Sequence, residues 1–285
     1  MPREIACDES GYEGEHLIGG VTAVFVHAGT DLDVAAAQEC VALLRERIRS
    51  PAQEYKANHL LRAKHRDALE WLLERMTGRA SVHLVDKAYL AATVLDRILP
   101  QRDAPSEALL LAVETALRAR DAAELAAAAA VLRALDPRIA DAVADHRAGE
   151  LAAPPAFGPL DPLPAAIGAT VDRWSAAGPV TLVHDRQTTL SDVRVAALRV
   201  AYPALAALVQ VPSRSDARVQ VADFLAGVAY RITARALAGH PDPVLLELLR
   251  PHVDPASLWI DKRSGTALGI RQGGSVTVPA SQVVG

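Results

Sequence analysis

Short apolar stretches that alternate with helical patterns constrain the fold of this chain more than any other feature. Arg3–Cys7 and His16–His27 read as strands, and the short turn between them favours an antiparallel pair. Ala80–Lys87 reads as a third strand after two helical segments. Beyond it, 178–185 and 204–211 read as strands that alternate with helices, although 204–211 also fits a helix. The sequence therefore predicts an α/β fold with a mixed sheet flanked by helices.

The helical segments carry recognisable start and stop signals. Asp33 is a suitable N-cap for a helix whose apolar residues recur every three or four positions, and Pro51 ends that helix. Arg66–Met76 predicts a second amphipathic helix. A long helix is predicted to start near Ser215.

The length allows one large domain or two small ones, and the sequence contains no internal repeat. Hydrophobic residues make up 51% and charged residues 22%, the balance of a folded soluble protein, and with 4% aromatic residues the core must rest on Ala, Val and Leu. We predict a single domain over 1–285. Within it we expect an alanine-rich helical insertion at 101–150, a proline-rich loop at 151–165 and a C-terminal hairpin region at 256–285.

Charge and cysteine content argue against several classes of protein. A net charge of −4 gives no overall attraction to phosphate, so binding of nucleic acid would need a local basic patch. Cys7 and Cys40 belong to no CxxC pair, which argues against structural zinc and favours buried free thiols. The sequence shows no secretion signal and no apolar run long enough to cross a membrane, so we expect a cytoplasmic protein without a membrane partner.

Four acidic residues stand where they could carry chemistry. Asp8 and Asp185 end predicted strands, Asp223 interrupts an apolar helix, and Glu54 lies in a connector two residues before Lys56. A buried carboxylate costs several kcal/mol unless it is paired or bound to a cation. Asp and Glu without His or Cys are the ligands of Mg²⁺ or Mn²⁺, ions that activate water and stabilise the leaving oxygen of a phosphodiester.

Each acid also has a structural explanation, and the sequence leaves both open. The run from Asp8 to Gly11 fits an Asx turn, Asp185 fits the start of a turn, and Asp223 fits a core acid paired with Arg218 or Arg231. The remaining polar residues of these segments are interpreted as caps or turns at Asp86, Ser191, Ser215 and Asp216, a core histidine at His184, and a solvated pair at Glu54 and Lys56. Motifs of P-loop, dinucleotide-binding, serine-elbow and zinc-protease sites are absent from the sequence.

Taken together, these short motifs resemble the domain of unknown function 3800 family, which is regarded as ribonuclease-H-like. The matching segments run from end to end of the chain: "DESG" at 8–11, "GG" at 19–20, "ExK" at 54–56, "HD" at 184–185 and "QVADFLAG" at 220–227. The alanine-rich helices and the glycine-rich tail depart from the pattern. The resemblance implies a ribonuclease-H-like mixed sheet flanked by helices, with the alanine-rich helices inserted.

The resemblance also implies roles for individual residues. Asp8, Asp185 and Asp223 would be metal ligands for Mg²⁺ or Mn²⁺ and catalytic, with Glu54 as a fourth acid. Substrate would contact Lys56, Ser10 and Gln220. Alternation along the strand predicts that Glu9 points away from Asp8, towards the substrate side or a supporting position.

Our first functional hypothesis is a metal-dependent phosphodiesterase or nuclease. Its phosphate contacts would come from the arginine-containing runs 45–49, 62–66 and 214–218, which also fit solvated helix faces. The second is a catalytically silent binding or assembly module in which the alanine-rich helices form a homodimer or partner surface. The third is a hydrolase of a phosphate-containing small molecule.

Overall fold

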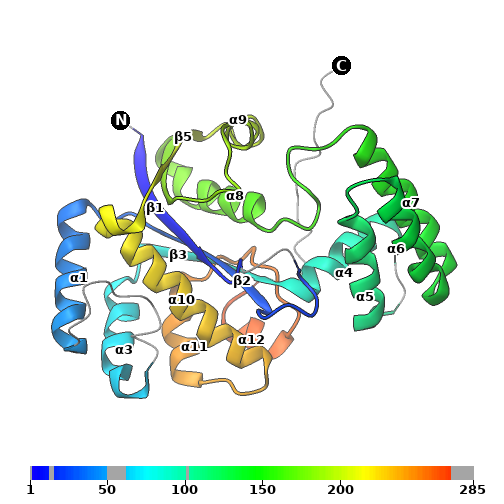
Figure 1. Ribbon diagram of the computed structural model, residues 1–285. Coiled ribbons are helices and arrows are strands. Elements are labelled where there is room, and N and C mark those ends of the chain that lie inside the picture. The colour runs from blue at the N-terminus through cyan, green and yellow to red at the C-terminus, as the bar shows by residue number, and fades with distance from the viewer. Residues whose placement is uncertain (1, 13–15, 50–61, 101–102, 271–285) are drawn as a thin grey trace.

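The chain forms an open mixed β-sheet with helices on both faces (Figure 1). The computed structural model describes residues 2–12, 16–49, 62–100 and 103–270. The five strands of the sheet lie in the order β3-β2-β1-β4-β5. They are β1 (Arg3–Ser10), β2 (Val24–Thr30), β3 (Ala80–Asp86), β4 (Val180–Asp185) and β5 (Leu205–Val211). The prediction of an α/β fold with a mixed sheet is confirmed.

Strand pairing changes from antiparallel to parallel at β1. β1 pairs antiparallel with β2, and β2 pairs antiparallel with β3. On its other side β1 pairs parallel with β4, and β4 pairs parallel with β5. β1 is therefore the central strand, and its carboxyl end lies beside the carboxyl end of β4.

The helices in chain order are α1 (Val34–Ile48), α3 (Arg66–Arg75), α4 (Lys87–Ile98), α5 (Glu107–Leu117), α6 (Ala122–Leu135), α7 (Pro137–Ala152), α8 (Leu163–Trp174), α9 (Asp192–Ala201), α10 (Ala217–Leu237), α11 (Pro243–Leu249) and α12 (Lys262–Ala267). Short 3₁₀ turns include η1 (Ala63–His65), η2 (Ser175–Ala177), η3 (Ser213–Ser215) and η4 (Arg250–His252). In Figure 1, α1, α3, α10 and α11 lie on one side of the sheet and α8 and α9 on the other, while α5, α6 and α7 stand at one end.

Two large clusters of buried apolar residues pack the helices against the two faces of the sheet. Phe224 on α10 packs with residues of α1, α3, β2 and β3 on one face. Ile167 on α8 packs with residues of β1, β4 and the helices α4 to α7 on the other. Residues of β2 and β3 are buried along their whole length, which explains why both strands read as continuous apolar runs.

The second strand begins later than the sequence predicts. The expected strand His16–His27 is replaced by an irregular segment up to Ala23, followed by β2 from Val24. Gly19 has a φ of +70° within this segment, a conformation that does not fit a strand. The backbone N–H groups of Leu17 and Ile18 donate instead to the carboxylate of Glu114, at 2.6 and 2.8 Å.

Glu114 ties the alanine-rich helices to this segment. It lies on α5, its side chain is fully buried, and its Oε1 also accepts from Arg118 Nε at 2.8 Å. The predicted helical insertion at 101–150 corresponds to α5, α6 and α7, the last of which continues to Ala152. These helices share the apolar cluster of the α8 face, so they are integrated into the core of the fold.

Capping residues behave largely as their types predict. Asp33 accepts from Ala36 N, Asp86 from Tyr89 N and Asp216 from Arg218 N. Ser191 occupies the cap position of α9 without a side-chain cap bond. The expected hairpin in 256–285 is wrong for its described part, because "DKRSGTA" forms α12 with Asp261 as its N-cap, and residues 271–285 lie outside the described residues.

Candidate functional site

Asp8 and Asp185 lie beside one another at the edge where β1 and β4 end. The parallel register pairs Cys7 with His184, which places the next residue of each strand, Asp8 and Asp185, at the same level. β1 is longer than predicted, since its pairing with β2 continues to Ser10 opposite Val26. Asp8 is therefore inside the strand rather than in a turn after it, and only 5% of its surface is exposed.

Gly11 explains the end of the "DESG" motif. Its φ is +83°, a region that favours glycine. A Cβ atom at this position would lie 2.1 Å from the carbonyl oxygen of Val24, much closer than any real contact. The glycine is thus required for the chain to leave the sheet against the start of β2.

Asp223 reaches the same region from α10, which packs across β1 and β2. Burial is the main cause of a rise in the pKa of Asp8 to about 9, and the charges of Glu9, Asp223 and Asp185 raise it further, while a backbone hydrogen bond from Glu9 lowers it. These carboxylates are close enough for their charges to interact. The structure therefore brings together the three acids that the sequence singled out as metal ligands. The three carboxylates and Glu9 are called the acid cluster below.

Glu9 is the fourth member of this cluster. It points to the α8 face, as strand alternation predicts, where its Oε2 lies 3.8 Å from Nε2 of His184. Burial is the main cause that raises its pKa to about 7, and Asp185 raises it further, whereas a hydrogen bond from Gln187 lowers it. Oε1 accepts that bond from Gln187 Nε2, but Oε2 is buried without a hydrogen-bond partner. The sequence-based expectation placed Glu9 on the substrate side or in a supporting position.

A buried chain of hydrogen-bonding groups lies beneath Glu9. His27 Nδ1 is 3.0 Å from Thr170 Oγ1, His27 Nε2 is 3.2 Å from His184 Nε2, and His184 Nδ1 is 2.8 Å from the carbonyl oxygen of Asp185. Both histidines are fully buried, and burial lowers the pKa of each, so both rings are neutral at pH 7.

Hydrogen-bond accounting fixes the direction of this chain. A carbonyl oxygen only accepts, so the proton of neutral His184 must be on Nδ1, and its Nε2 is an acceptor. His27 must then donate from Nε2 and accept at Nδ1 from the Thr170 hydroxyl. That hydroxyl has the Ala166 carbonyl at 3.1 Å as a second acceptor within reach. The chain therefore runs from α8 to the backbone of Asp185.

Asp185 is also held from the opposite side. Its Oδ1 accepts from the backbone N–H of Ser213, in η3, at 2.7 Å. The peptide carbonyl and the carboxylate of this residue are thus fixed by two different elements. These two hydrogen bonds keep the Asp185 carboxylate in a fixed position at the end of β4.

The other predicted site residues are placed as follows. Ser10 ends β1, and Gln220 lies one helical turn before Asp223 on α10. Glu54 and Lys56 lie outside the described residues. Arg218, one suggested partner of Asp223, pairs instead with Asp216 at 2.7 Å and Glu4 at 2.6 Å. Cys7 and Cys40 are buried free thiols, as predicted.

Sequence reasoning missed the partners of Glu9 and His184. His27, Thr170 and Gln187 come from β2, α8 and the loop after β4, and no spacing along the chain links them. The available signal was the presence of two histidines in strands that are otherwise apolar.

The donor set fits a hard divalent cation in its chemistry, since it consists of carboxylates and includes a buried oxygen of Glu9 without a hydrogen-bond partner. Burial and the neighbouring acids raise the pKa of two of its members, Asp8 and Glu9. Over the described ranges, however, no group of three or more His, Cys, Asp or Glu side chains is arranged so that it could hold a metal ion.

Comparison with known proteins gave no match among family models, curated proteins or solved structures. None of the helices in the described part of the chain has the length and apolar character that crossing a membrane requires.

Proposed function

We propose that this chain is a ribonuclease-H-like, metal-dependent phosphodiesterase or nuclease. The observation that carries the proposal is the convergence of Asp8, Asp185 and Asp223 from two strands and a helix. Burial raises the pKa of Asp8 to about 9, and the charges of Glu9, Asp223 and Asp185 contribute to this rise. A protein gains no stability from like charges held close together where solvent is largely excluded, so such a cluster is typical of a functional site. The resemblance to the domain of unknown function 3800 family implies these same residues.

In this proposal Asp8, Asp185 and Asp223 hold Mg²⁺ or Mn²⁺. The bound cation would supply activation of water and stabilisation of the leaving oxygen of a phosphodiester. Ser213 and the chain from Thr170 to the Asp185 carbonyl fix Asp185. Glu9 would support the site from the α8 face, where its Oε2 is buried beside His184 without a hydrogen-bond partner.

Titration of the metal tests the proposal. Mg²⁺ or Mn²⁺ is added to the wild type, Asp8→Asn and Asp223→Asn, and the heat of binding and the thermal midpoint are measured. We expect millimolar metal to raise the midpoint of the wild type and to leave both variants unchanged. Asp33→Asn is the matched control, because Asn also caps helices and Asp33 lies away from the cluster. A wild type with no metal-dependent stabilisation contradicts the proposal.

Cleavage assays then define the substrate. Single-stranded, duplex and hybrid nucleic acids and a small chromogenic phosphodiester are incubated with the metal-loaded wild type and with Asp8→Asn. Turnover of a nucleic acid by the wild type alone supports a nuclease. Turnover of the small phosphodiester alone favours a small-molecule hydrolase.

One observation favours the alternative of a silent binding module. The carboxylates already have internal partners, since Asp8 accepts from Glu9 N at 2.8 Å and Asp185 from Ser213 N at 2.7 Å. In that case the acids bind no metal and only destabilise the folded protein. The Asn variants are then more stable than the wild type, with or without added metal.

A further inference from the structure

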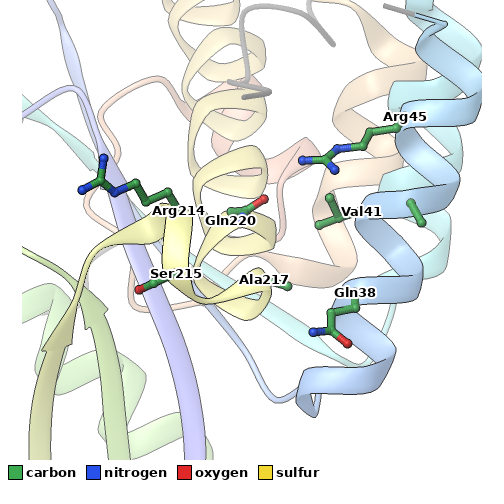
Figure 2. Close-up of a pocket in the computed structure, with 8 residues that line it drawn as sticks. Gln38, Val41, Arg45, Arg214, Ser215, Ala217 and Gln220 are labelled. Carbon is green, nitrogen blue, oxygen red and sulfur yellow. The ribbon is translucent and has the colours of Figure 1, made fainter. Parts of the chain in front are cut away.

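A polar groove lies between α1 and the start of α10 (Figure 2). It encloses about 500 Å³. One wall is α1 with Gln38 and Arg45, and the other is formed by η3 and α10 with Arg214, Ser215 and Gln220. In Figure 2, Arg45 extends from α1 towards α10, whereas Arg214 extends from η3 away from α1 and so extends the positive charge beyond the groove.

The chemistry of the lining fits an anion. Two arginines, two glutamines and a serine line the groove, and no acidic residue is among its described lining residues. The arginines come from 45–49 and 214–218, which are far apart in the sequence and line one groove only in the fold. In a chain of net charge −4 this is a local basic site, and guanidinium groups bind phosphate oxygens through paired N–H donors.

The groove shares two structural elements, η3 and α10, with the acid cluster. η3 carries Arg214 and also Ser213, whose N–H donates to Asp185 at 2.7 Å. On α10, Gln220 and Asp223 are three positions apart and therefore lie on neighbouring turns of one helix face, about 4.5 Å apart along the axis. A chain molecule bound in the groove would therefore lie next to the two elements that hold Asp185 and carry Asp223.

We propose that this groove binds the sugar-phosphate backbone of a single-stranded nucleic acid, next to the phosphodiester held at Asp8, Asp185 and Asp223. The inference rests on the proposed function, which it deepens by naming the substrate class. A groove between two helices has room for one strand rather than for a duplex. None of its described lining residues is aromatic, so the bases find no stacking surface and binding should be independent of sequence and sensitive to salt.

Binding of a fluorescein-labelled single-stranded oligonucleotide, DNA and RNA in parallel, tests the inference by anisotropy. The buffer contains EDTA, so the measurement does not depend on the metal. The test variant is Arg45→Gln with Arg214→Gln. The control is Arg199→Gln with Arg235→Gln, which removes the same charge from exposed arginines on α9 and the far part of α10. The thermal midpoint of each variant reports that the fold is retained.

We expect the test variant to weaken binding about tenfold at low salt and the control to change it little. The dependence of log K on log salt should become shallower by about 1.4 in the test variant, since each phosphate contact to a single strand contributes about 0.7. Equal losses in both variants, or complete competition by millimolar inorganic phosphate, overturn the inference.

The outcome is separable from that of the proposed function. If the wild type binds no metal but the test variant binds the oligonucleotide more weakly, the inference about the groove stands and the proposed phosphodiesterase activity is contradicted. If the protein binds metal and cleaves nucleic acid, and the test and control variants are equally active, the proposed function stands and the inference about the groove is contradicted.

Discussion

The Nε2 atoms of His27 and His184 face each other at 3.2 Å across the central strand β1. Two neutral imidazoles satisfy this contact only if one of them donates. Because His184 Nδ1 is committed to the carbonyl oxygen of Asp185, the donor must be His27. The buried chain therefore has one direction, which ends at the residue that carries a candidate catalytic carboxylate.

Nitrogen NMR checks this assignment directly. In ¹⁵N-labelled protein at pH 7, long-range ¹H–¹⁵N spectra should show the Nδ1–H tautomer for His184 and the Nε2–H tautomer for His27. Thr170→Val should alter the His27 signals, because the Thr170 hydroxyl lies 3.0 Å from its Nδ1. A doubly protonated pattern at His184 would contradict the assignment and indicate an ion pair with Glu9.

Replacement of Asp8 by Asn should stabilise the metal-free protein at neutral and higher pH. An unfolded aspartate has a pKa of about 3.9, whereas burial and the neighbouring carboxylates raise the pKa of Asp8 in the folded protein to about 9. The folded state binds this proton more tightly, so its contribution to stability is complete below about pH 4 and is lost as the pH rises towards 9.

We expect Asp8→Asn to raise the free energy of unfolding by about 1–3 kcal/mol at pH 8, and by less near pH 4, in urea titrations with EDTA present. Asp33→Asn serves as the control and should show no such pH-dependent gain. A variant less stable than the wild type at pH 8 would show that the carboxylate is compensated within the protein.

Substitutions at two glycines with positive φ allow the cost of backbone strain to be measured separately from the cost of steric crowding. Gly11 and Gly19 have φ values of +83° and +70°, but a Cβ at Gly11 would lie 2.1 Å from Val24 O, whereas a Cβ at Gly19 would meet nothing within 4 Å. Gly19→Ala should cost about 1–2 kcal/mol from strain alone. Gly11→Ala should cost about 3 kcal/mol or more, measured as the free energy of unfolding. Equal costs would mean that β2 moves away without penalty.

Glu114 should be essential for the position of 16–23. Its carboxylate accepts from the N–H groups of Leu17 and Ile18 and from Arg118, and its side chain is fully buried. Glu114→Ala leaves these donors without a partner and should destabilise the protein by about 2–4 kcal/mol. Glu114→Gln keeps one accepting oxygen and should cost less. Hydrogen exchange at Leu17 and Ile18 should accelerate in both variants, and most in Glu114→Ala.

The sequence predicted the parts of the fold that depend on local pattern. The strand ending near Asp185, the helix capped by Asp33 and the half-buried acid at Asp223 follow from periodicity, capping and the cost of a carboxylate among apolar residues. The start of β2 could not be predicted, because its limit is set by Glu114, almost a hundred residues away. The pairing of His27 with His184 depends on the register of three strands, which no local pattern encodes. The presence of Arg45 and Arg214 along one groove depends in the same way on the packing of α1 against α10.

The central place of β1 has a consequence for synthesis on the ribosome. Its partner β2 follows within about thirty residues of the chain start, but its other partner, β4, begins only at Val180, and α10 follows later still. A nascent chain that has produced α8 therefore exposes one unpaired edge of an apolar strand. Such edges recruit other chains, so this protein is expected to depend on chaperones or slow elongation during that interval, and Asp8 to meet Asp223 among the last events of folding.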